Sequence, residues 1–404
     1  MRHLLLNMFL YNIIIKTYWI GIRLAALLGH KKANYFLECR KNARSLQYND
    51  YSDFIWFHCA SLGEFEQVRH LIERIKKDNK ESSILLSFYS PSGYEYQKNY
   101  KFADDVIYLP FDTQKNITKL LKIANPKLLV INNKEIWLNL IKQTRNKIII
   151  VNANFHENDF LFSVLGKLHQ KAILQLNHIF CQNPTTLSLL KGIGCNNISL
   201  SNDMRIDRVL SIKAQKNEII NTFKANQKLI ILGSTYHREH HLIKNYLEAT
   251  HHEFKTIIAP PDIDQKTIAD IEAIFENQVI KYSQYSSSKD DKIMLLDTIG
   301  QLQSAYAFAD LAIIGGGFNN GIHNILEPAR FNLTIFHGPK HHKFEAAEAL
   351  LKQKASFEFC DQNTFNSLMD KFLNDKLATT SSKHYLESNK GATSQIMEYI
   401  QKLI

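Results

Sequence analysis

Short apolar runs alternate with amphipathic stretches from Phe54 onward. This alternation is typical of parallel sheets whose strands are joined by helices and are buried on both faces. Two series of strands are expected, the first at residues 54–59, 83–88, 105–109, 127–132, 147–151 and 178–181 and the second at 228–233, 255–259, 292–296, 310–314 and 333–336. Helices are expected within the first series at residues 65–77, 114–123, 135–143 and 159–176. The pattern therefore predicts two doubly wound α/β domains.

The boundary between the two series lies in residues 196–227, which are mostly polar and have no clear core strand after Leu200. A chain of 404 residues is too long for one ordinary core and fits two domains of about 150–200 residues each. We therefore expect one domain at residues 46–206 and a second at 207–404, which ends in a short helix.

The first 45 residues differ from the rest of the chain in pattern and in charge. Residues 3–30 are strongly apolar, but Lys16 and Arg23 interrupt them, so no uncharged run reaches the roughly 18 residues of a spanning helix. Of the formal net charge of +10, a net +7 lies here, from eight basic residues and one acidic residue. Tyr18 and Trp19 favour the headgroup level of a bilayer. We interpret residues 1–45 as a monotopic membrane anchor, with a single span or a buried core helix as alternatives.

The positions of the basic residues and of the cysteines indicate the class of binding partner and the redox compartment. Because the basic residues are interleaved with apolar ones, they favour an anionic membrane surface over nucleic acid. The five cysteines are scattered without a CxxC pair, which argues for a reducing compartment and against a disulfide framework. Positive charges at and after the apolar segment would keep the following domain on the cytoplasmic side of a membrane.

The stretch at residues 309–344 carries most of the candidate chemistry. An apolar run leads into Gly315 to Gly317, and Gly321 follows a few residues later. His323 to Ala329 reads as the first turn of a helix, so its N–H groups and the positive end of the helix dipole would favour an anion. Glu327 is placed to accept hydrogen bonds from sugar hydroxyls. The alternative interpretation is an ordinary strand-to-helix turn that happens to be rich in glycine.

A second candidate is the loop after the first expected strand, Ser61-Leu62-Gly63-Glu64. Ser61 is a good helix N-cap, and Glu64 three residues later would complete a capping box, which is a structural role. The functional interpretation rests on position, because a carboxylate just beyond a parallel strand lies where such sheets bind ligands. The loop alone leaves both interpretations open.

Both stretches resemble signatures of the Kdo transferases, inverting glycosyltransferases that move 3-deoxy-D-manno-octulosonic acid (Kdo) from CMP-Kdo onto a lipid A precursor. The first loop resembles the Ser-x-Gly-Glu signature of that family. The longer stretch matches the nucleotide-binding signature at Gly315, Gly316, Gly321, His323, Asn324, Leu326, Glu327, Pro328, Ala329, Gly338, Pro339 and Phe344. The resemblance runs from about Phe54 to Phe344, with a weaker echo at residues 391–393.

The resemblance implies the GT-B fold, in which two Rossmann-like domains face a cleft, and it implies that Glu64 is the general base. A lipid-borne sugar hydroxyl would lose its proton as it attacks the anomeric carbon of Kdo, while CMP departs from the opposite face. Amides and cations can hold the charge of the CMP phosphate. No cofactor is therefore expected, and the sequence has no Asp-x-Asp motif of metal-dependent sugar transferases. The expected acceptor is lipid IVA, at the cytoplasmic face of the bacterial inner membrane.

The resemblance also assigns residues to the two substrates. Expected donor-binding residues are Arg205, Ser234, Thr235, Gly315, Gly316, Gly317, Gly321, His323, Asn324 and Glu327. Expected acceptor-binding residues are Ser61, Gly63, Ser90, Ser92 and Glu135. Structural alternatives exist for some of them, since the loop of Ser234 and Thr235 can serve as a helix N-cap and Arg205 as an exposed surface charge.

Four positions depart from the pattern of the family. Many members carry a glutamate where Asn133 stands, a proline at Leu138, an arginine at Asn154 and a basic or imidazole residue at Pro261. These departures affect single contacts, whereas Glu64 and the glycine-rich stretch are intact. Two alternatives stay open: a GT-B transferase that uses a UDP-sugar, and a catalytically weakened sugar-nucleotide-binding protein at the membrane.

Histidine-rich stretches suggest a metal site at first sight. His237 to His241 lack both the HExxH spacing and a nearby cysteine partner. His337, His341 and His342 are interpreted in the same way, so no metal site is expected. His323 is different, because an imidazole at a helix N-terminus can donate a hydrogen bond to a phosphate.

Overall fold

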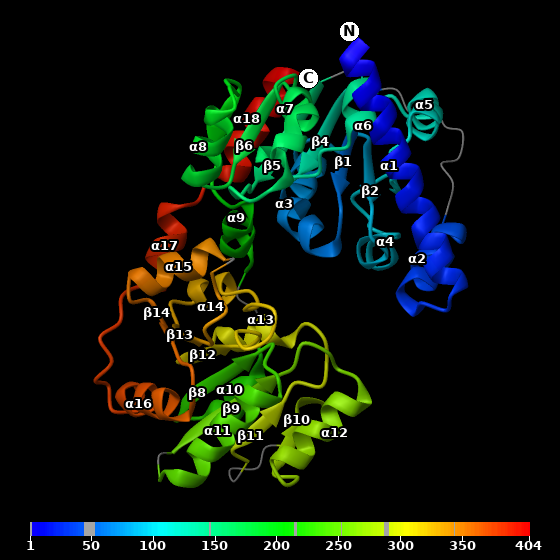
Figure 1. Cartoon of the computed structure of the whole chain (residues 1–404). Helices are drawn as coiled ribbons and strands as arrows, with labels where there is room; N and C mark the ends of the chain where they lie inside the picture. The colour runs from blue at the N-terminus through cyan, green and yellow to red at the C-terminus, as the bar shows by residue number, and fades with distance from the viewer. Residues whose placement is uncertain are drawn as a thin grey trace. The chain divides into compact units, whose positions relative to one another are not determined.

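The computed structural model describes residues 2–43, 53–144, 147–213, 216–251, 253–286, 291–342 and 344–404, with the side chains of residues 2–7 left out (Figure 1). The chain forms two compact units: Met1–Arg208 with Lys390–Ile404, called unit 1, and Val209–Asn389, called unit 2. Each unit is built on a seven-stranded sheet whose pairings are all parallel. The prediction of two doubly wound α/β domains is confirmed.

The sheet of unit 1 has the strand order β3-β2-β1-β4-β5-β6-β7. Its strands are β1 (Ile55–Cys59), β2 (Ile84–Phe88), β3 (Asp105–Tyr108), β4 (Leu128–Asn132), β5 (Lys147–Ala153), β6 (His178–Cys181) and β7 (Ile198–Leu200). The chain moves outward in one direction from β1 to β3 and then returns to place β4 on the other side of β1. In such sheets ligands bind outside the carboxyl ends of the strands at this switch point.

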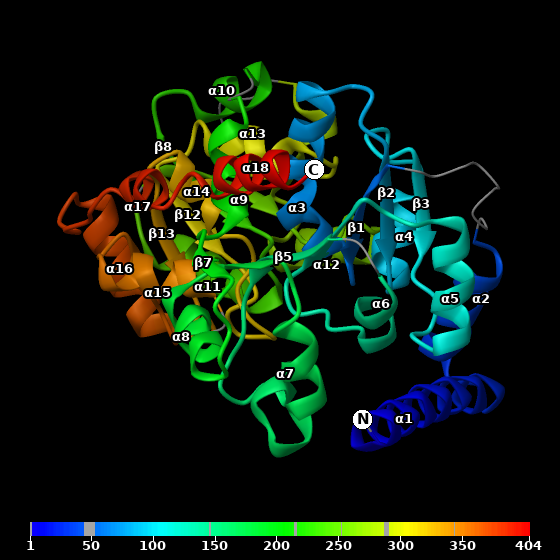
Figure 2. The same ribbon diagram turned by 90° about the horizontal axis from the view of Figure 1, so that it is seen from above.

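Helices cover both faces of the unit 1 sheet (Figure 2). They are α1 (Arg2–Leu27), α2 (Lys31–Lys41), α3 (Leu62–Asp78), α4 (Pro91–Gln97), α5 (Gln114–Ile123), α6 (Leu138–Gln143), the 3-10 turns η1 (Phe160–Phe162) and η2 (Val164–Gly166), α7 (Lys167–Ile173), α8 (Pro184–Gly192), α9 (Met204–Ser211) and α18 (Ala392–Leu403). Alternate residues of β1 face opposite cores: Phe57 packs with α3 and α18, and Trp56 packs with α5, α6 and α8.

Helices α1 and α2 are fixed to unit 1 by polar contacts. The Tyr11 hydroxyl of α1 donates to Asp112 Oδ2 at 2.7 Å, and Asp112 is fully buried. Arg40 of α2 donates to the carbonyls of Leu109 at 2.8 Å and Tyr89 at 2.6 Å. Both anchoring points lie on loops that follow strands of the sheet, so the amino-terminal helices hold the same edge that carries the expected chemistry.

The structure also bears on the three interpretations of the amino-terminal segment. Of the described side chains of α1, only that of Met8 is buried, which excludes a buried core helix. No single helix in the described part of the chain has the length and apolar character to cross a bilayer. Met8–Leu27 and α2 meet that requirement only as a pair bent by 112°. Arg44, which contributes to the basic charge of this segment, lies outside the described residues.

The sheet of unit 2 has the strand order β10-β11-β9-β8-β12-β13-β14. Its strands are β8 (Lys228–Gly233), β9 (Phe254–Ala259), β10 (Val279–Lys281), β11 (Ile293–Leu295), β12 (Leu311–Ile314), β13 (Thr334–His337) and β14 (Ser356–Glu358). Here β8 has β9 on one side and β12 on the other, so the switch point lies between β8 and β12.

The helices of unit 2 again lie on two faces of the sheet. They are α10 (Glu218–Lys224), α11 (His237–Ala249), α12 (Gln265–Ile274), the 3-10 turn η3 (Tyr282–Gln284), α13 (Gln301–Tyr306), α14 (Leu326–Arg330), α15 (Glu345–Lys352), α16 (Gln362–Leu373) and α17 (Ser382–Ser388). One core joins α11, α12 and α16 to the sheet. On the opposite face, Tyr306 of α13 reaches Gly233 at the end of β8.

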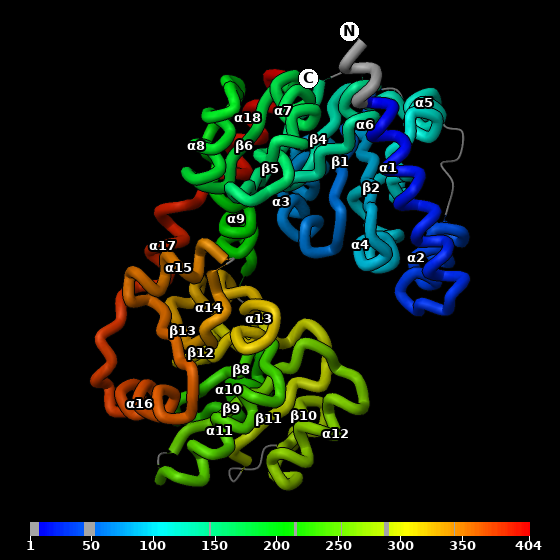
Figure 3. The backbone as a smooth tube through the Cα atoms, in the orientation of Figure 1, coloured from blue at the N-terminus to red at the C-terminus, as the bar shows by residue number. Residues whose placement is uncertain are grey.

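Two expectations differ from the structure. The carboxyl-terminal helix, expected as part of a domain at residues 207–404, belongs to unit 1, because Ile396 and Ile400 of α18 join the core with α3 (Figure 3). The helix expected at residues 159–176 is broken into η1, η2 and α7. The break is steric: a Cβ at Gly166 would lie 2.2 Å from the Phe160 carbonyl oxygen, so the chain is folded tightly back at this point.

Candidate functional site

Glu64 lies at the carboxyl end of β1, in the first turn of α3. Its Oε2 accepts a hydrogen bond of 2.6 Å from the Ala60 N–H, the amide that precedes the N-cap residue Ser61. Within the described residues the Ser61 side chain makes no cap hydrogen bond. The capping box is therefore not formed. Instead, the Glu64 carboxylate stabilises the loop between β1 and α3 through its hydrogen bond with Ala60.

The electrostatic surroundings of Glu64 favour a proton acceptor. Burial is the largest influence and raises the pKa of this carboxyl, and the nearby charge of Glu135 raises it further. Hydrogen bonds from Ala60 and Asn133 and the charge of Lys134 act in the opposite direction, and the result is a pKa of about 7. A carboxyl with this pKa has both protonation states populated at neutral pH, which suits general base catalysis.

Asn133 and Glu135 follow β4, the strand beside β1 across the switch point. Asn133 has a positive φ of 63°, a conformation that asparagine adopts more readily than most residues. Burial raises the pKa of Glu135, while Trp137 and Lys134 oppose that shift. Because α6 begins only at Leu138, Glu135 lies in a loop and not in the helix expected at residues 135–143. The sheet edge thus brings a second carboxylate close to Glu64.

The Ser90 loop after β2 completes this edge of unit 1. The Ser90 N–H donates to the Ala60 carbonyl at 2.8 Å, which ties the loop to the one that carries Glu64. Ser90 caps α4 by accepting from the Ser92 N–H, and the two serine hydroxyls lie 2.8 Å apart. Gly63 and Ser92 are exposed, and Ser61 and Ser90 are partly exposed. All the expected acceptor-binding residues therefore lie in the loops and first helical turns that follow β1, β2 and β4.

A buried polar chain supports this edge from below, and sequence reasoning missed it. The Trp137 N–H donates to His58 Nε2 at 3.0 Å, so the other ring nitrogen, Nδ1, carries the proton and lies 2.9 Å from the Ser87 hydroxyl. The Trp56 N–H also donates to Ser87 at 2.7 Å. Burial lowers the pKa of His58 to about 3, so this imidazole stays neutral. The signal in the sequence was polar residues inside otherwise apolar strands.

In unit 2, the loop Gly233-Ser234-Thr235 follows β8, as the nucleotide-binding expectation requires. Thr235 is buried, and its hydroxyl lies 3.0 Å from Nε2 of His240, which is also buried. Burial lowers the pKa of His240 to about 4. The Thr235 hydroxyl is therefore engaged by the chain itself, whereas Ser234 is partly exposed at the sheet edge. The expected hydroxyl contact is better suited to Ser234 than to Thr235.

The four glycines after β12 allow close packing of backbone on backbone. A Cβ at Gly315 would lie 2.1 Å from the Ser234 carbonyl oxygen, and one at Gly317 would lie 2.6 Å from the Gly338 Cα. Gly316 and Gly321 have φ values of 89° and 129°, which residues with a side chain rarely adopt. We expected these glycines to allow the close approach of a ligand. In the structure, the missing side chains allow the close approach of the neighbouring loops instead.

Glu239 is a second residue that sequence reasoning missed. Its carboxylate is buried and accepts from the Gly316 N–H at 3.2 Å and from the Tyr236 N–H at 3.1 Å. Burial raises its pKa, and the hydrogen bonds from these amides act against the shift. One amide of the glycine stretch, expected to bind an anion, is thus occupied by an anion of the chain. Glu239 holds the start of α11 against the glycine stretch.

His323, Asn324 and Glu327 form the exposed end of the glycine stretch. His323 Nε2 lies 2.9 Å from the Tyr236 hydroxyl, and the two rings stack. Asn324 accepts from the Leu326 N–H at 3.0 Å and donates to Glu327 Oε1 at 2.9 Å, so its side chain is fixed beside the start of α14. Helix α14 has five residues and begins at Leu326, later than the expected His323. The macrodipole of such a short helix is weaker than we expected.

Arg205, expected to bind the donor, lies in unit 1 at the start of α9. Its guanidinium forms an ion pair with Asp203 at 2.6 Å, and Gln182 donates to the same carboxylate at 2.9 Å. Asp203 thus compensates the charge of Arg205 and orients its side chain. The role of Arg205 in donor binding stays a prediction.

The four departures from the expected pattern have modest structural consequences. Asn133 contacts Glu64, as described above. Leu138 is buried as the first residue of α6. Asn154 accepts a hydrogen bond from the Asn183 amide at 3.0 Å. Pro261 is partly exposed beyond β9.

Unit 1 also has a basic groove beside α1, with a volume of about 1270 Å³. Apolar side chains of α1 line one side, and five exposed lysines line the remainder: Lys16, Lys115, Lys119, Lys122 and Lys142. In the described part of the chain none of these five forms an ion pair with an acidic side chain. An apolar helix beside unpaired positive charge suits an anionic surface.

A second group of exposed apolar side chains lies on η2, with Val164 82% and Leu165 79% exposed. Hydrogen bonds hold the turn that carries these two side chains. The Ser163 hydroxyl donates to the Phe160 carbonyl, and the Gln170 amide donates to the Leu161 carbonyl, both at 2.7 Å. This turn is in contact with α1 through the ring of His169, which packs against Phe160 and Tyr11. Helix α1 and the segment that carries Val164 are therefore neighbours on the Tyr11 side of the helix.

The fold places the chain in the class of α/β proteins that have two doubly wound parallel sheets. The structure resembles the crystal structure of UDP-GlcNAc 2-epimerase from Neisseria meningitidis bound to UDP-GlcNAc, with a TM-score of 0.58 and 12% identity over 86% of this chain and 99% of that one. A similar likeness holds for UDP-GlcNAc 2-epimerase from Methanocaldococcus jannaschii, with a TM-score of 0.57 and 14% identity over 86% of this chain and 98% of that one. At these identities the likeness shows the fold alone.

Sequence comparison shows similarity to one family. Residues 29–208 match the family described as 3-deoxy-D-manno-octulosonic-acid transferase (kdotransferase). The 3-deoxy-D-manno-octulosonic acid transferase of Aquifex aeolicus is 27% identical over 80% of this chain and 86% of its own length. The corresponding protein of Haemophilus influenzae is 26% identical over 70% of each chain. The expected resemblance to the Kdo transferases is confirmed.

A longer relative is the bifunctional glycosyltransferase/methyltransferase of Fusobacterium nucleatum, 25% identical over 94% of this chain. This chain spans 61% of the length of that protein.

Proposed function

We propose that this protein transfers Kdo from CMP-Kdo to a glycolipid acceptor, with Glu64 as the general base. The observation that carries the proposal is the state of Glu64, a partly buried carboxyl with a pKa of about 7 at the switch point of a domain that matches the Kdo transferase family. Kdo transferase relatives that match most of the chain support the same reaction.

In the proposed reaction, Glu64 takes the proton of the attacking acceptor hydroxyl. The hydroxyl oxygen forms a bond to the anomeric carbon of Kdo, and the bond from that carbon to the CMP phosphate oxygen breaks on the opposite face. CMP leaves with the bonding electron pair, and the configuration at the anomeric carbon is inverted. Glu135 and Asn133 set the proton affinity of Glu64 without taking the proton themselves.

For the donor, we propose that the exposed polar groups at the edge of unit 2 contact CMP-Kdo. Ser234, His323, Asn324 and Glu327 are the candidates, because their side chains lie at the carboxyl ends of β8 and β12 and are at least partly exposed. The packed glycine stretch supplies the shape of the site, and Arg205 of unit 1 stays a donor-binding residue by the family resemblance alone. Burial lowers the pKa of His323, so it acts as a neutral imidazole toward the phosphate.

For the acceptor, we propose lipid IVA, presented at the cytoplasmic face of the bacterial inner membrane. The support is the surface of unit 1, where α1 lines the lysine groove, contacts His169 through Tyr11, and η2 exposes Val164 and Leu165. Fully burying an apolar side chain of this size contributes about 1.5–3 kcal/mol, and each lysine near an anionic leaflet about 1 kcal/mol. These contributions suit reversible attachment.

The membrane part of the proposal is tested with vesicles that contain anionic lipid. The double variant Val164→Glu/Leu165→Glu is expected to lower the bound fraction at least tenfold, and Ile299→Glu serves as control because Ile299 is 90% exposed in unit 2. Equal binding of both variants would show that the Val164 turn stays in water.

The reaction itself is tested by incubating the protein with CMP-Kdo and lipid IVA and analysing the lipid by mass spectrometry. The expected product carries the mass of one or more Kdo residues, and free CMP appears in proportion. Because the fold is shared with UDP-sugar enzymes, UDP-sugars form the second arm of the donor screen. Transfer from a UDP-sugar and not from CMP-Kdo would establish the runner-up, another GT-B transferase. No transfer from any donor, with CMP still bound, would indicate a sugar-nucleotide-binding protein.

A further inference from the structure

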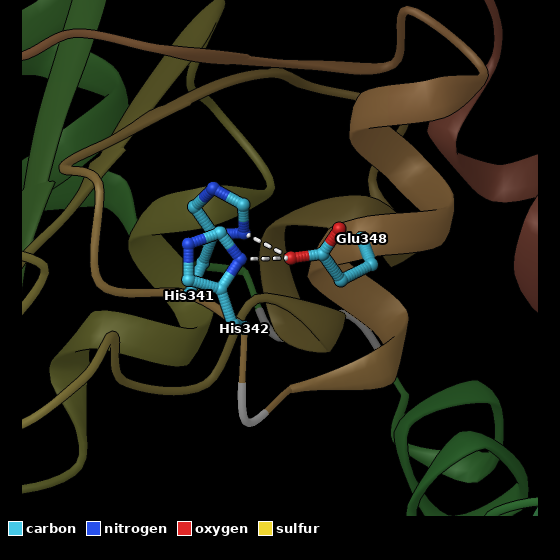
Figure 4. A group of neighbouring side chains, drawn as sticks. All are labelled: His341, His342 and Glu348. Atoms are coloured by element: carbon cyan, nitrogen blue, oxygen red, sulfur yellow. Dashed lines mark hydrogen bonds and ion pairs between the residues drawn. The ribbon is translucent and has the colours of Figure 1, made fainter.

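Three potential metal ligands meet on the loop that follows β13. His341 and His342 precede α15, and Glu348 lies one turn into that helix. Nδ1 of His341 and Nδ1 of His342 each lie 2.8 Å from the same oxygen, Oε1 of Glu348. Figure 4 shows both imidazole rings directed at this carboxylate. The ligand atoms of the three residues all lie within 4.8 Å of one another.

His341 is oriented by a second carboxylate. Its other ring nitrogen, Nε2, lies 2.6 Å from Glu358 Oε2, so this position carries the ring proton. The Nδ1 atom of the neutral ring then has a free lone pair, and it has no hydrogen-bond partner among the residues that the structure describes. A histidine that binds a metal through one nitrogen commonly donates from the other to a carboxylate.

The contact between His341 and Glu348 requires a positive charge. His341 is 2% exposed, so water does not separate its Nδ1 lone pair from the carboxylate oxygen. Two lone pairs that face each other at this distance repel. Either a proton on the ring or a bound cation relieves the repulsion.

We propose that His341, His342 and Glu348 bind a divalent transition-metal ion, with Glu358 holding His341 in the coordinating tautomer. Two imidazoles and a carboxylate are ligands that suit Zn²⁺, and a three-residue set leaves a fourth position for water. No metal site was expected from the sequence, because the spacing of these ligands along the chain fits no metal motif. The third ligand, Glu348, comes from α15, the helix that follows the two histidines.

The proposed ion lies on the segment that supports the glycine stretch. The Lys340 N–H donates to the Gly317 carbonyl at 2.8 Å, and the Ile322 N–H donates to the Lys340 carbonyl at 3.2 Å. An ion that fixes His341 would therefore stiffen the glycine stretch through its neighbour Lys340. This coupling to nucleotide binding rests on the proposed function, whereas metal binding does not.

The test is isothermal titration of Zn²⁺ into the full-length protein after treatment with EDTA. One equivalent is expected to bind, at least 100-fold more weakly in His342→Ala and in Glu348→Gln. Loss of the orienting carboxylate in Glu358→Gln should weaken binding about 10–100-fold. His384→Ala, an exposed histidine in unit 2, is the matched control. His342 is 78% exposed, so its replacement leaves the core intact.

Three outcomes would overturn the proposal. They are no Zn²⁺ binding, equal binding in the His342→Ala and Glu348→Gln variants, and loss of binding only in His237→Ala/His241→Ala, whose imidazoles lie 3.2 Å apart on α11. The first outcome would assign the positive charge to a proton on the ring. CMP titration with and without Zn²⁺ then measures the coupling, expected as severalfold tighter binding with the metal. If CMP fails to bind under either condition, the proposed function fails, while the Zn²⁺ result still stands.

Discussion

Both sheets have a switch point beside their first strand, but the polar groups at the carboxyl ends of their strands are used differently. In unit 1 the edge carries ionisable side chains whose pKa values are raised by burial, above all Glu64 and Glu135. In unit 2 the equivalent edge is already occupied by its own chain: Glu239 holds the Gly316 amide, and His240 holds the Thr235 hydroxyl. The edge of unit 1 therefore carries a group that can exchange a proton, whereas the polar groups at the edge of unit 2 hold its own loops in place.

This difference explains why the two edges tolerate change differently. A carboxyl with a raised pKa responds to every charge placed near it, so unit 1 is sensitive to charge. Backbone packed on glycine responds to added volume, so unit 2 is sensitive to a single methyl group. The following variants test this contrast, from the largest expected effect to the smallest.

Removing the proton acceptor of unit 1 is expected to have the largest effect. Glu64→Gln keeps the shape of the side chain but cannot accept the proton, so kcat should fall about 10²–10⁴-fold. CMP affinity should change less than twofold, because the edge of unit 2 is untouched. The measurement is initial rate beside CMP titration, with the exposed Glu81→Gln as control. An unchanged rate would remove Glu64 from the mechanism.

Adding one methyl group to the edge of unit 2 should disturb binding instead of proton transfer. In Gly315→Ala the new Cβ would lie 2.1 Å from the Ser234 carbonyl oxygen, so the two loops must separate. We expect CMP affinity to fall at least tenfold and the free energy of unfolding to fall by about 1–3 kcal/mol. Gly192→Ala is the control, since a Cβ there meets nothing within 4 Å. Normal CMP affinity in Gly315→Ala would contradict this account.

The dependence of rate on pH should report the environment of Glu64. The pKa of this carboxyl is raised to about 7, so the protonated, inactive form dominates below that pH. The rate is therefore expected to rise as the pH increases through about 7 and to level off above it. Asn133→Asp replaces a hydrogen-bond donor with a like charge, and the midpoint should move upward by about one pH unit. A midpoint that stays in place would show that another group controls the profile.

The smallest effect is expected at the rim of the glycine stretch. Tyr236→Phe removes the hydroxyl that lies 2.9 Å from His323 Nε2. A typical hydrogen bond contributes about 0.5–1.5 kcal/mol net, so CMP affinity should fall about two- to tenfold while kcat is retained. A larger loss of kcat than of affinity would indicate that His323 takes part in the chemical step.

The central strands of both sheets were predictable from sequence because they are buried on both faces. Strands such as β1 and β12 appear as unbroken apolar runs. The edge strands β7, β10 and β14 were not predicted, since each has three residues and none forms a fully buried run. The break at Gly166 was hidden as well, because the apolar pattern continues through it and only the fold brings the Phe160 carbonyl against that residue.

The residues of the candidate sites also fall into two groups, those that a local sequence pattern predicts and those that it does not. Glu64 and the glycine stretch were found because each follows a strand and forms a local motif, whereas Ser90 and Ser92 were assigned by the family resemblance alone. Glu239 was not found, because its partner Gly316 lies 77 residues further along the chain. Long-range pairs between a side chain and a backbone amide leave no periodic or local signal in a sequence. They become visible only once the topology brings two strand ends together.

The attachment of α1 has a consequence for how the protein is made. The hydrogen bond from Tyr11 can form only after Asp112, which lies 101 residues later in the chain, has been synthesised. At a synthesis rate of about 5–20 residues per second, this leaves the helix without its docking partner for roughly 5–20 s. During that interval the apolar helix has left the ribosome ahead of the domain that will hold it. Under the proposed membrane attachment, the helix would therefore reach a lipid surface before the domain that holds it has folded.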